Sequence, residues 1–372
     1  MFFYCLLVGT VEENAAKVVD VVQVKATDAD VGSNADITYR ITGGNSESFF
    51  AINISAGIIS TTAQLDFEKT PAFNLTVSAS DSKFTTFVSV VIEVVNENDN
   101  DPSFPRPMYY ANVAENSAVV TSVVTVIASD VDPFGQLTYS IESVQPGNHS
   151  DAFSIDLTSG LISTADVLDR EMIDSYVITV KATDGGKPSR HGFTSVMVNV
   201  TDTNDNPPVF NSSSVTAVIS EASPVSTFVT KITATDLDSG SNAEISYSII
   251  SGNEMSAFVI SPNTGIITTN MKLDRENISN YALICRATDR GNNPLYSMSL
   301  IVHVTVSDVN DNAPIFDQSV YMVNVTEDVS SGTVVEEMHA VDKDAGLNGI
   351  VSYRITAGND DGTFDIGNGT GE

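Results

Sequence analysis

Short runs of alternating apolar and polar residues follow one another along this chain, separated by Gly, Asn, Ser and Pro. The runs are rich in β-branched and aromatic residues, which favour strands, and no stretch has the 3.6-residue period of an amphipathic helix. Between residues 215 and 306 we expect seven strands: Val215–Ser220, Phe228–Thr235, Ile245–Ile250, Phe258–Ile260, Ile266–Thr269, Tyr281–Ala287 and Ser297–Val306. Seven short strands in about 100 residues are typical of an all-β fold, an antiparallel sandwich of immunoglobulin-like type.

Acidic motifs recur along the chain in a fixed order, which is the mark of an internal repeat. The Glu of an early Val-x-Glu segment recurs at steps of 102, 106 and 106 residues by subtraction, at Glu13, Glu115, Glu221 and Glu327. An Asp-x-Asp follows with the same steps, at Asp28/Asp30, Asp130/Asp132, Asp236/Asp238 and Asp342/Asp344. A Leu-Asp-x-Glu ends at Glu68, Glu171 and Glu276, and an Ala-x-Asp ends at Asp81, Asp184 and Asp289. Acid- and Asn-rich segments then close three units, at 96–100, 202–206 and 308–312.

Prolines after each closing segment stop the last strand and send the chain onward in extended form. These prolines are Pro102, Pro207/Pro208 and Pro314. We therefore expect three repeats and a partial fourth, arranged end to end, at 1–101, 102–207, 208–313 and 314–372. The start, Met1–Val8, has no basic segment or cleavage site of a signal peptide and is interpreted as a clipped first strand. We expect the chain to be a fragment of a longer array.

The charge of the chain excludes several classes of partner. The sequence has 48 Asp and Glu against 17 Lys and Arg, a formal net charge of -31. This charge opposes binding to nucleic acid and to anionic membranes, and it favours cations. No segment reaches the ~18 apolar residues of a membrane span, so we expect membrane attachment only through a segment absent from this chain. Of the two cysteines, Cys5 and Cys285, the second lies in an apolar-alternating segment and is expected to be a buried free thiol.

The recurring acids have the chemistry of a hard cation site. Ca²⁺ takes about six to eight oxygen ligands from carboxylates, carbonyls and Asn side chains. The acidic motifs contain no His or Cys at ligand spacing, which disfavours zinc. The segment after Asp28 places Gly32 one position too early for an EF-hand loop, and it lies in a β pattern.

Five strings together give a specific family resemblance that covers essentially the whole chain. They are Val-Ala-Glu-Asn (113–116), Ala-Thr-Asp-Leu-Asp-Ser-Gly-Ser-Asn (234–242), Leu-Asp-Arg-Glu (168–171 and 273–276), Ala-Thr-Asp (182–184) and Asp-Val-Asn-Asp-Asn-Ala-Pro (308–314). The chain resembles a run of cadherin repeats. The resemblance implies tandem immunoglobulin-like Greek-key sandwiches, about three Ca²⁺ per complete junction, and calcium-dependent cell-cell adhesion. The implied partners are other cadherin ectodomains, homophilic or heterophilic, at the extracellular face of the plasma membrane in a single-pass protein.

The resemblance also assigns ligands, position by position. The first junction takes Glu13, Asp66, Glu68, Asn98, Asp99, Asn100, Asp130, Asp132 and Asp184. The second takes Glu115, Asp169, Glu171, Asp202, Thr203, Asn204, Asp205, Asn206, Asp236, Asp238, Asn242 and Asp289. The third takes Glu221, Asp274, Glu276, Asp308, Val309, Asn310, Asp311, Asn312, Asp342, Asp344 and Asn348. Near Thr203, Asn206 and their counterparts the expected ligand is the backbone carbonyl. Asp28, Asp30, Asn34 and Asp81 form the lower half of a further site.

The first junction departs from this pattern. Asn96 replaces the leading Asp, and the loop after Asp132 is two residues shorter than its counterparts, so we expect weaker calcium binding there. Phe67 replaces the Arg of the Leu-Asp-Arg-Glu motif and is expected to matter less, because that Arg is not a ligand.

Two other classes of function remain as alternatives. Paired carboxylates can serve glycoside hydrolysis, but that chemistry needs one unique pair, whereas these acids recur, so we expect no enzyme and no small-molecule substrate. The nearer alternative is a structural spacer that touches no partner. Eight Asn-x-Ser/Thr sequons are compatible with an extracellular glycoprotein: Asn53, Asn74, Asn148, Asn199, Asn211, Asn277, Asn324 and Asn368.

Overall fold

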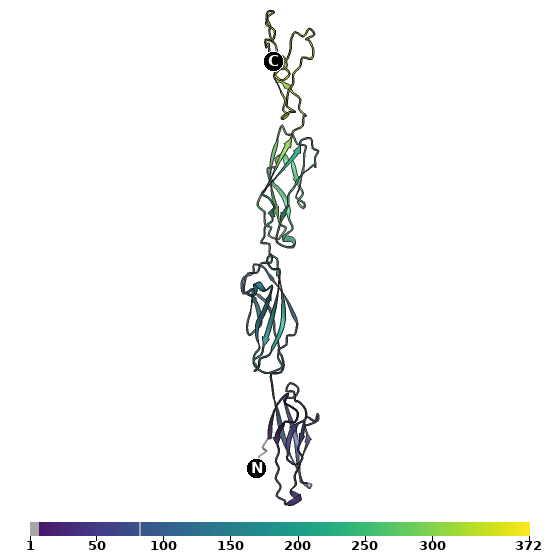
Figure 1. The fold of residues 1–372 in the computed structure, drawn as a ribbon, viewed down its shortest axis with the longest axis vertical. Coiled ribbons are helices and arrows are strands. Elements are labelled where there is room, and N and C mark those ends of the chain that lie inside the picture. Colours follow the sequence, from purple (N-terminus) through teal and green to yellow (C-terminus); the bar gives the residue numbers. More distant parts are fainter. Residues whose placement is uncertain (1–6, 82) are drawn as a thin grey trace. The chain divides into compact units, whose positions relative to one another are not determined.

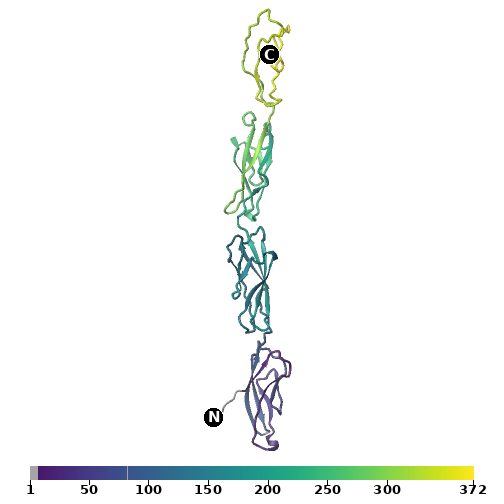
Figure 2. The ribbon, with the colours of Figure 1, turned by 60° about the vertical axis from the view of Figure 1, so that its left-hand side comes forward.

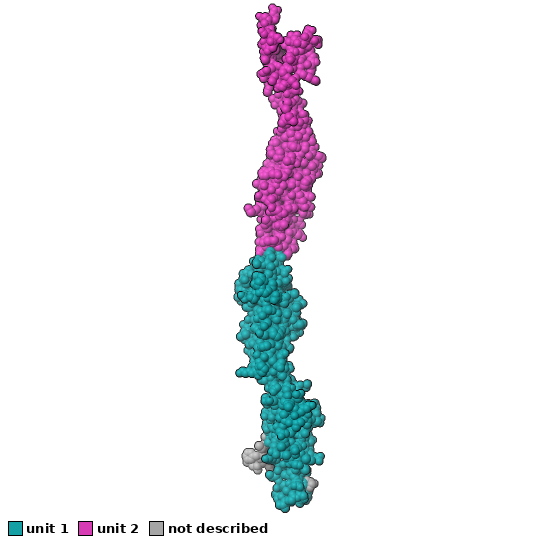
Figure 3. Space-filling model, in the orientation of Figure 1, with its two compact units in different colours: residues 1–201 teal, residues 202–372 magenta. Residues whose placement is uncertain are grey.

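The computed structural model describes residues 7–81 and 83–372. Most of the expected start segment and Cys5 lie outside the described residues. The chain divides into two compact units, Met1–Thr201 and Asp202–Glu372, coloured separately in Figure 3.

The first repeat packs two sheets face to face (Figure 1). One sheet has the order β1-β7-β6-β3, and the other has the order β2-β5-β4. The strands are β1 (Leu7–Glu12), β2 (Asp20–Gln23), β3 (Thr38–Gly43), β4 (Phe50–Ile52), β5 (Ile58–Thr61), β6 (Ala72–Ser80) and β7 (Thr85–Val95), with a 3₁₀ helix η1 (Gly32–Ala35) before β3. Apolar side chains from both sheets, among them Ile59, Leu75 and Val77, fill the space between them.

The second repeat belongs to the same unit and repeats this topology. Its sheets have the orders β10-β13-β14-β8 and β11-β12-β9. The strands are β8 (Met108–Ala114), β9 (Ser122–Thr125), β10 (Thr138–Gln145), β11 (Phe153–Ile155), β12 (Leu161–Thr164), β13 (Ser175–Thr183) and β14 (His191–Thr201), with η2 (Gly147–His149) after β10. Its core contains Ile162, Ile178 and Val180.

The third repeat opens the second unit. Its main sheets have the orders β16-β23-β22-β19 and β17-β21-β20, and a small sheet pairs β15 with β18. The elements are β15 (Val209–Phe210), β16 (Ser214–Ser220), β17 (Phe228–Lys231), β18 (Ala234–Thr235), η3 (Gly240–Asn242), β19 (Ser246–Ser251), η4 (Glu254–Ser256), β20 (Phe258–Ile260), β21 (Ile266–Thr269), β22 (Asn280–Thr288) and β23 (Leu300–Ser307). The expected all-β class of tandem sandwiches is confirmed.

Three details of the strand prediction are wrong. The run Phe228–Thr235 is two strands, because the N–H of the buried Ile232 bonds to Gly265 O at 3.0 Å and the chain then leaves β21 to pair with β15. The last strand begins at Leu300 rather than Ser297, whose N–H and hydroxyl are already bonded to the backbone of Ala287.

The third correction concerns strand direction. The first and last strands of a repeat run parallel, as in β1 with β7, β8 with β14 and β16 with β23. An odd number of strands makes the chain leave a sandwich at the end opposite to where it entered, so the first and last strands point the same way. The other strand pairs of these sandwiches are antiparallel, as expected.

The fourth segment, 314–372, has little regular structure among the described residues. It contains β24 (Ile315–Phe316) and β25 (Ala340–Val341), and the rest is drawn mostly without arrows in Figures 1 and 2. Residues 321–325 align with β16, whose partner in the third repeat is β23. A step of 106 from β23 reaches beyond residue 372, and among the described residues no strand pairs with 321–325.

Three further features of the structure bear on the sequence predictions: the sequons, Cys285 and the helices. The eight sequon asparagines are all exposed. Cys285 is a buried free thiol, as expected. Among the described residues, no helix has the length and apolar character needed to cross a membrane.

Candidate metal centres at the repeat ends

One buried glutamate organises the end of each complete repeat. Glu13, Glu115 and Glu221 are 1%, 2% and 2% exposed, yet each accepts a backbone hydrogen bond of 2.8 Å from the Leu-Asp-x-Glu loop, at Phe67, Arg170 and Arg275 respectively. Glu13 and Glu221 also accept 2.7 Å bonds from the closing segment, at Glu97 and Val309. Each of these two carboxylates therefore holds two loops together at the repeat end.

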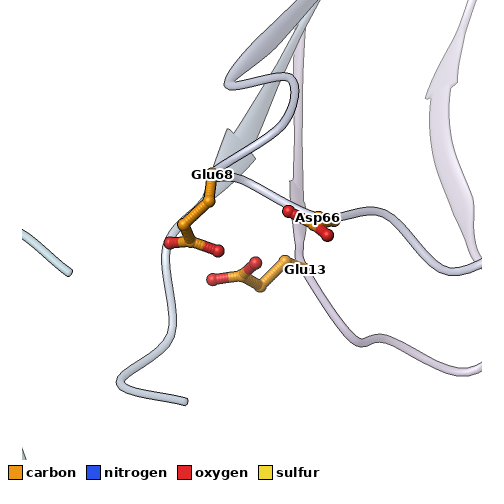
Figure 4. A group of neighbouring side chains, drawn as sticks. All are labelled: Glu13, Asp66 and Glu68. Atoms are coloured by element: carbon orange, nitrogen blue, oxygen red, sulfur yellow. The ribbon is translucent and has the colours of Figure 1, made fainter. Parts of the chain in front are cut away.

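Further acids meet this glutamate at the first junction. One oxygen each of Glu13, Asp66 and Glu68 lies within 4.8 Å of the others. Figure 4 shows the carboxylates of Glu13 and Glu68 facing each other. Oxygens of Glu68, Asp99 and Asp132 form a second group within the same limit. The first repeat, the linker and the second repeat therefore each contribute a carboxylate to one place.

The Asp-x-Asp motif is held by a tyrosine that our sequence analysis did not assign. The Ala two residues before the first Asp donates its N–H to a Tyr hydroxyl in all four repeats, at 2.9–3.0 Å: Tyr39, Tyr139, Tyr247 and Tyr353. The second Asp of each motif donates its N–H to the side chain of the first at 2.8–3.0 Å. The motif is thus a fixed turn, and at Asp130 and Asp236 the second oxygen has no hydrogen-bond partner among the described residues.

Asn98 and Asn204 link the closing segments to the following repeats in the same way. Asn98 Nδ2 donates to Asp184 at 2.9 Å and to Pro188 O at 2.8 Å. Asn204 Nδ2 donates to Asp289 at 3.1 Å and to Asn293 O at 2.8 Å. In both cases a glycine admits the amide, because a Cβ at Gly186 or Gly291 would lie 2.2 or 2.5 Å from Nδ2.

Four buried oxygens at these sites have no hydrogen-bond partner among the described residues. They are Asn98 Oδ1 and Asn204 Oδ1, from one repeated position, and Asp130 Oδ2 and Asp236 Oδ2, from another. Buried polar oxygens are normally bonded, and leaving one unpaired costs about 1–3 kcal/mol. A buried oxygen that receives no proton donor is suited to a hard cation, so the residues present fit Ca²⁺.

The last Asn of each closing segment uses its side chain as a donor. Asn100, Asn206 and Asn312 each donate Nδ2 to the preceding Asp and to the second Asp of the following Asp-x-Asp, at 2.6–3.2 Å. Nδ2 is held as a donor in these bonds, which tie the closing segment to the following Asp-x-Asp.

The residues expected at the second junction belong to both units. In the first unit, oxygens of Glu115, Asp169 and Glu171 lie within 4.8 Å of one another. In the second unit, Asp202 accepts bonds from Ser239 N at 2.9 Å and Asn242 Nδ2 at 2.8 Å. The remaining expected ligands of this junction, Thr203, Asn204, Asp205, Asn206, Asp236, Asp238 and Asp289, also lie in the second unit.

The third junction contains an arginine among its acids. Arg275 forms ion pairs with Glu276 and Asp308 and donates to Lys343 O at 2.9 Å. Asp308 also accepts Asn348 Nδ2 at 2.8 Å, as Asp202 accepts Asn242. Asn310 Nδ2 reaches Asn348 O at 3.5 Å. The Arg of the motif, expected to matter little, therefore neutralises two candidate ligands and reaches the next repeat.

The first junction lacks two of these features. Asn96 stands in place of Asp202, and the shorter loop of the second repeat has no 3₁₀ helix and no Asn matching Asn242. With its amide oriented to suit its neighbours, Asn96 Nδ2 donates to Glu13 Oε1 at 3.2 Å and to Glu68 Oε1 at 2.9 Å. A donor thus replaces an acceptor beside two candidate ligands.

The acids raise one another's proton affinity. Burial raises the pKa of Glu68 to about 7, and its hydrogen bond with Asp132 and the charge of Glu13 add to the rise. Burial and then Glu115 raise the pKa of Glu171 to about 7, with Arg170 acting in the opposite direction. Burial also raises the pKa values of Asp236 and Asp238. Carboxylates packed in this way favour a positively charged partner.

The lower half site of the first repeat is also assembled. Oxygens of Asp28, Asp30 and Asp81 lie within 4.8 Å of one another, and Asn34 lies in η1 beside them in sequence. Asp28 and Asp30 are exposed.

Comparison with known proteins identifies the family. A family model described as "Cadherin domain" matches residues 7–95, 109–201, 215–307 and 321–372. Human Protocadherin Fat 1 is 39% identical over 96% of this chain, and rat Cadherin-23 is 38% identical over 97% of it. The chain spans only 8% and 11% of the lengths of these two relatives.

Solved structures agree with the family match. Three repeats of mouse Cadherin-23 (EC22-24) align with a TM-score of 0.71 at 31% identity, covering 82% of this chain and 96% of that one. The Protocadherin GammaB4 extracellular domain aligns with a TM-score of 0.82 at 29% identity, covering 98% of this chain and 59% of that one. The chain belongs to the cadherin family, and it consists of cadherin repeats.

Proposed function

We propose that this chain is a calcium-stabilised segment of the extracellular region of an adhesion protein. Its repeats divide at 1–101, 102–207, 208–313 and 314–372, and each complete junction between them holds about three Ca²⁺. The whole protein is a single-pass protein at the outer face of the plasma membrane, anchored by a part other than these repeats, and its partners are other cadherin ectodomains. The relatives named above are cadherins, which supports adhesion over catalysis.

The observation that supports this proposal most strongly is the recurrence of buried, unpartnered oxygens. Asn98 Oδ1 and Asn204 Oδ1 are 106 residues apart, as are Asp130 Oδ2 and Asp236 Oδ2. A chance defect of packing would not recur at the same two positions of two repeats. A repeated function for these oxygens, binding of a cation, accounts for their recurrence.

The charges of the chain give the mechanism. The set proposed for the first junction contains seven carboxylates: Glu13, Asp66, Glu68, Asp99, Asp130, Asp132 and Asp184. Like charges about 4 Å apart repel by roughly 1–4 kcal/mol per pair at effective dielectric constants of 80 to 20. Bound Ca²⁺ supplies the opposite charge. The buried glutamates and the Asp-x-Asp turns hold these acids in place, so closing the site fixes the linker against both repeats.

Calcium titration by calorimetry tests the metal sites. We expect about three ions at the second junction, where the acid of every motif is present, and Kd values of about 10⁻⁴–10⁻³ M as in other extracellular modules. Asp236→Asn changes a residue with an unpartnered oxygen and should reduce the heat of calcium binding. Asp166→Asn changes an acid outside the expected ligand set and should leave that heat unchanged. Equal heats for wild type and both variants would refute the assignment.

Bead aggregation separates adhesion from a spacer function. Beads coated with this segment should aggregate in millimolar calcium and disperse in chelator if these repeats contact cadherin partners. Coated beads that stay dispersed while the segment still binds calcium would favour the spacer.

A further inference from the structure

At the first junction the second repeat sends an arginine side chain onto the linker. Arg190 Nε donates to the backbone carbonyl of Asn98 at 2.7 Å, and its Nη1 pairs with Asp101 at 2.8 Å. Asp101 lies outside the set of expected calcium ligands. One guanidinium therefore binds both ends of the segment 98–101.

The backbone of Arg190 is fixed, which positions this contact. Its N–H donates to both oxygens of Asp184, at 3.0 and 3.1 Å, and its carbonyl accepts Asp184 N at 3.3 Å. Asp184 also accepts the side chain of Asn98 at 2.9 Å. The carbonyl and the Nδ2 of Asn98 are thus both bound to the second repeat, while its Oδ1 stays buried and unpartnered.

The corresponding position of the third repeat lacks this cation. Leu295 takes the place of Arg190, since it makes the same backbone contacts to Asp289, at 3.3 and 2.6 Å. Conversely, the third repeat has Arg275 in its Leu-Asp-Arg-Glu motif, and this arginine binds acids of the third junction. The first repeat has Phe67 at the corresponding position. The first junction has therefore lost the cation of the repeat above and has gained one from the repeat below.

We propose that Arg190 is a built-in cation that holds the linker 98–101 on the second repeat when calcium is absent. Glu97 stays on the first repeat through its N–H bond to Glu13. Without calcium the segment 98–101 then keeps its contacts to the second repeat through Arg190, in addition to the bond from Asn14 of the first repeat to Asp99. This inference rests on the proposed calcium sites only for its contrast with the loaded state.

Amide hydrogen exchange of the full chain in chelator tests the proposal directly. Arg190→Leu, which installs the residue of the third repeat, should speed exchange of 98–101 by about fivefold or more. An exposed ion pair accounts for up to about fivefold, and the charged hydrogen bond adds to it. Arg290→Leu, at an exposed arginine of the third repeat paired with Glu244, is the matched control and should leave 98–101 unchanged. Leu295→Arg should slow exchange of 202–206.

Two further comparisons separate the loss of the Arg190 contacts from unfolding and from the loss of calcium. If Arg190→Leu also speeds exchange in β13 and β14, the substitution has disturbed the fold, and Asp101→Ala is the variant to use. It removes the exposed partner of Arg190 and should reproduce part of the faster exchange at 98–101. Equal exchange of 98–101 in wild type and in the folded Arg190 and Asp101 variants would overturn the proposal. In wild type, calcium should slow exchange at 202–206. If calcium leaves exchange at 202–206 unchanged while the Arg190 and Asp101 variants behave as expected, the calcium sites are refuted and the role of Arg190 stands.

Discussion

Glu221 accepts a 2.7 Å hydrogen bond from the backbone N–H of Val309, 88 residues further along the chain. The same carboxylate accepts the N–H of Arg275 at 2.8 Å. One buried glutamate therefore joins the end of β16, the Leu-Asp-Arg-Glu loop and the linker that leaves the repeat. In calcium-free protein this carboxylate acts as a structural clasp, in addition to its proposed function as a ligand.

Glu221→Ala should destabilise the third repeat even without calcium. It leaves two partly buried N–H groups unbonded, which together cost about 2–4 kcal/mol. Differential scanning calorimetry in chelator measures this loss separately from any loss of calcium. Glu254→Ala, at an exposed glutamate of η4, is the control and should change stability by less than about 0.5 kcal/mol. A Glu221→Ala protein as stable as wild type in chelator would contradict the clasp.

Gly291→Ala should weaken calcium binding with little loss of stability. The new Cβ would lie 2.5 Å from Asn204 Nδ2 and 2.6 Å from Asn242 Oδ1, and these side-chain ends can move aside. Moving them displaces the unpartnered oxygen of Asn204, so we expect about tenfold weaker binding at that junction, as when groups that orient metal ligands are lost. Gly147→Ala, where a Cβ meets nothing within 4 Å, is the control. Unchanged calcium affinity in Gly291→Ala would remove Asn204 from the site.

Asn96→Asp should have opposite effects with and without calcium. In chelator it replaces a donor to Glu13 and Glu68 with a third negative charge, so the melting temperature of the first unit should fall. In millimolar calcium it restores the missing acid, so calorimetric titration should show tighter binding at the first junction. Asn112→Asp, at an exposed position of β8, adds the same charge away from the site. It should change neither the melting temperature in chelator nor the calcium affinity. The same shift in both conditions would contradict the account of Asn96.

Cys285 should be inert to alkylation until the third repeat unfolds. It is fully buried, and burial raises its thiol pKa to about 11. Because the folded pKa lies above that of the unfolded thiol, this group's contribution to stability is complete below pH 9 and is lost as the pH rises toward 11. A Cys5→Ser background isolates the thiol for mass spectrometry with iodoacetamide. Rapid labelling of native protein at pH 8 would show that the site opens.

Repeats, strands and acidic motifs could be predicted from the sequence because they depend on local patterns. Alternation identified β20 and β21 to the residue, and the spacing of the acids identified positions that the structure brings together, such as Glu13, Asp66 and Glu68. The split of 228–235 could not be predicted in this way. The reason is a sheet change set by tertiary contacts of Ile232, which alternation does not encode.

The contacts that support the acids were not predicted from the sequence either, although one of them corresponds to a recurring residue. The Tyr that binds each Asp-x-Asp turn recurs 13 residues after the bonded Ala in three repeats and 11 after it in the second, where the loop is shorter. That recurrence was visible as a repeated aromatic position, but a core tyrosine looks the same in sequence. Arg190 left no such signal, because it occurs in one repeat and its partner is a backbone carbonyl.

We expect calcium to close the junctions and stiffen the chain. Small-angle X-ray scattering of the full chain in millimolar calcium and then in excess chelator tests it most directly. The account predicts a long, stiff particle in calcium and a shorter maximum dimension with a broader distribution of distances in chelator. Identical scattering in the two conditions would contradict the calcium sites and the mechanism built on them.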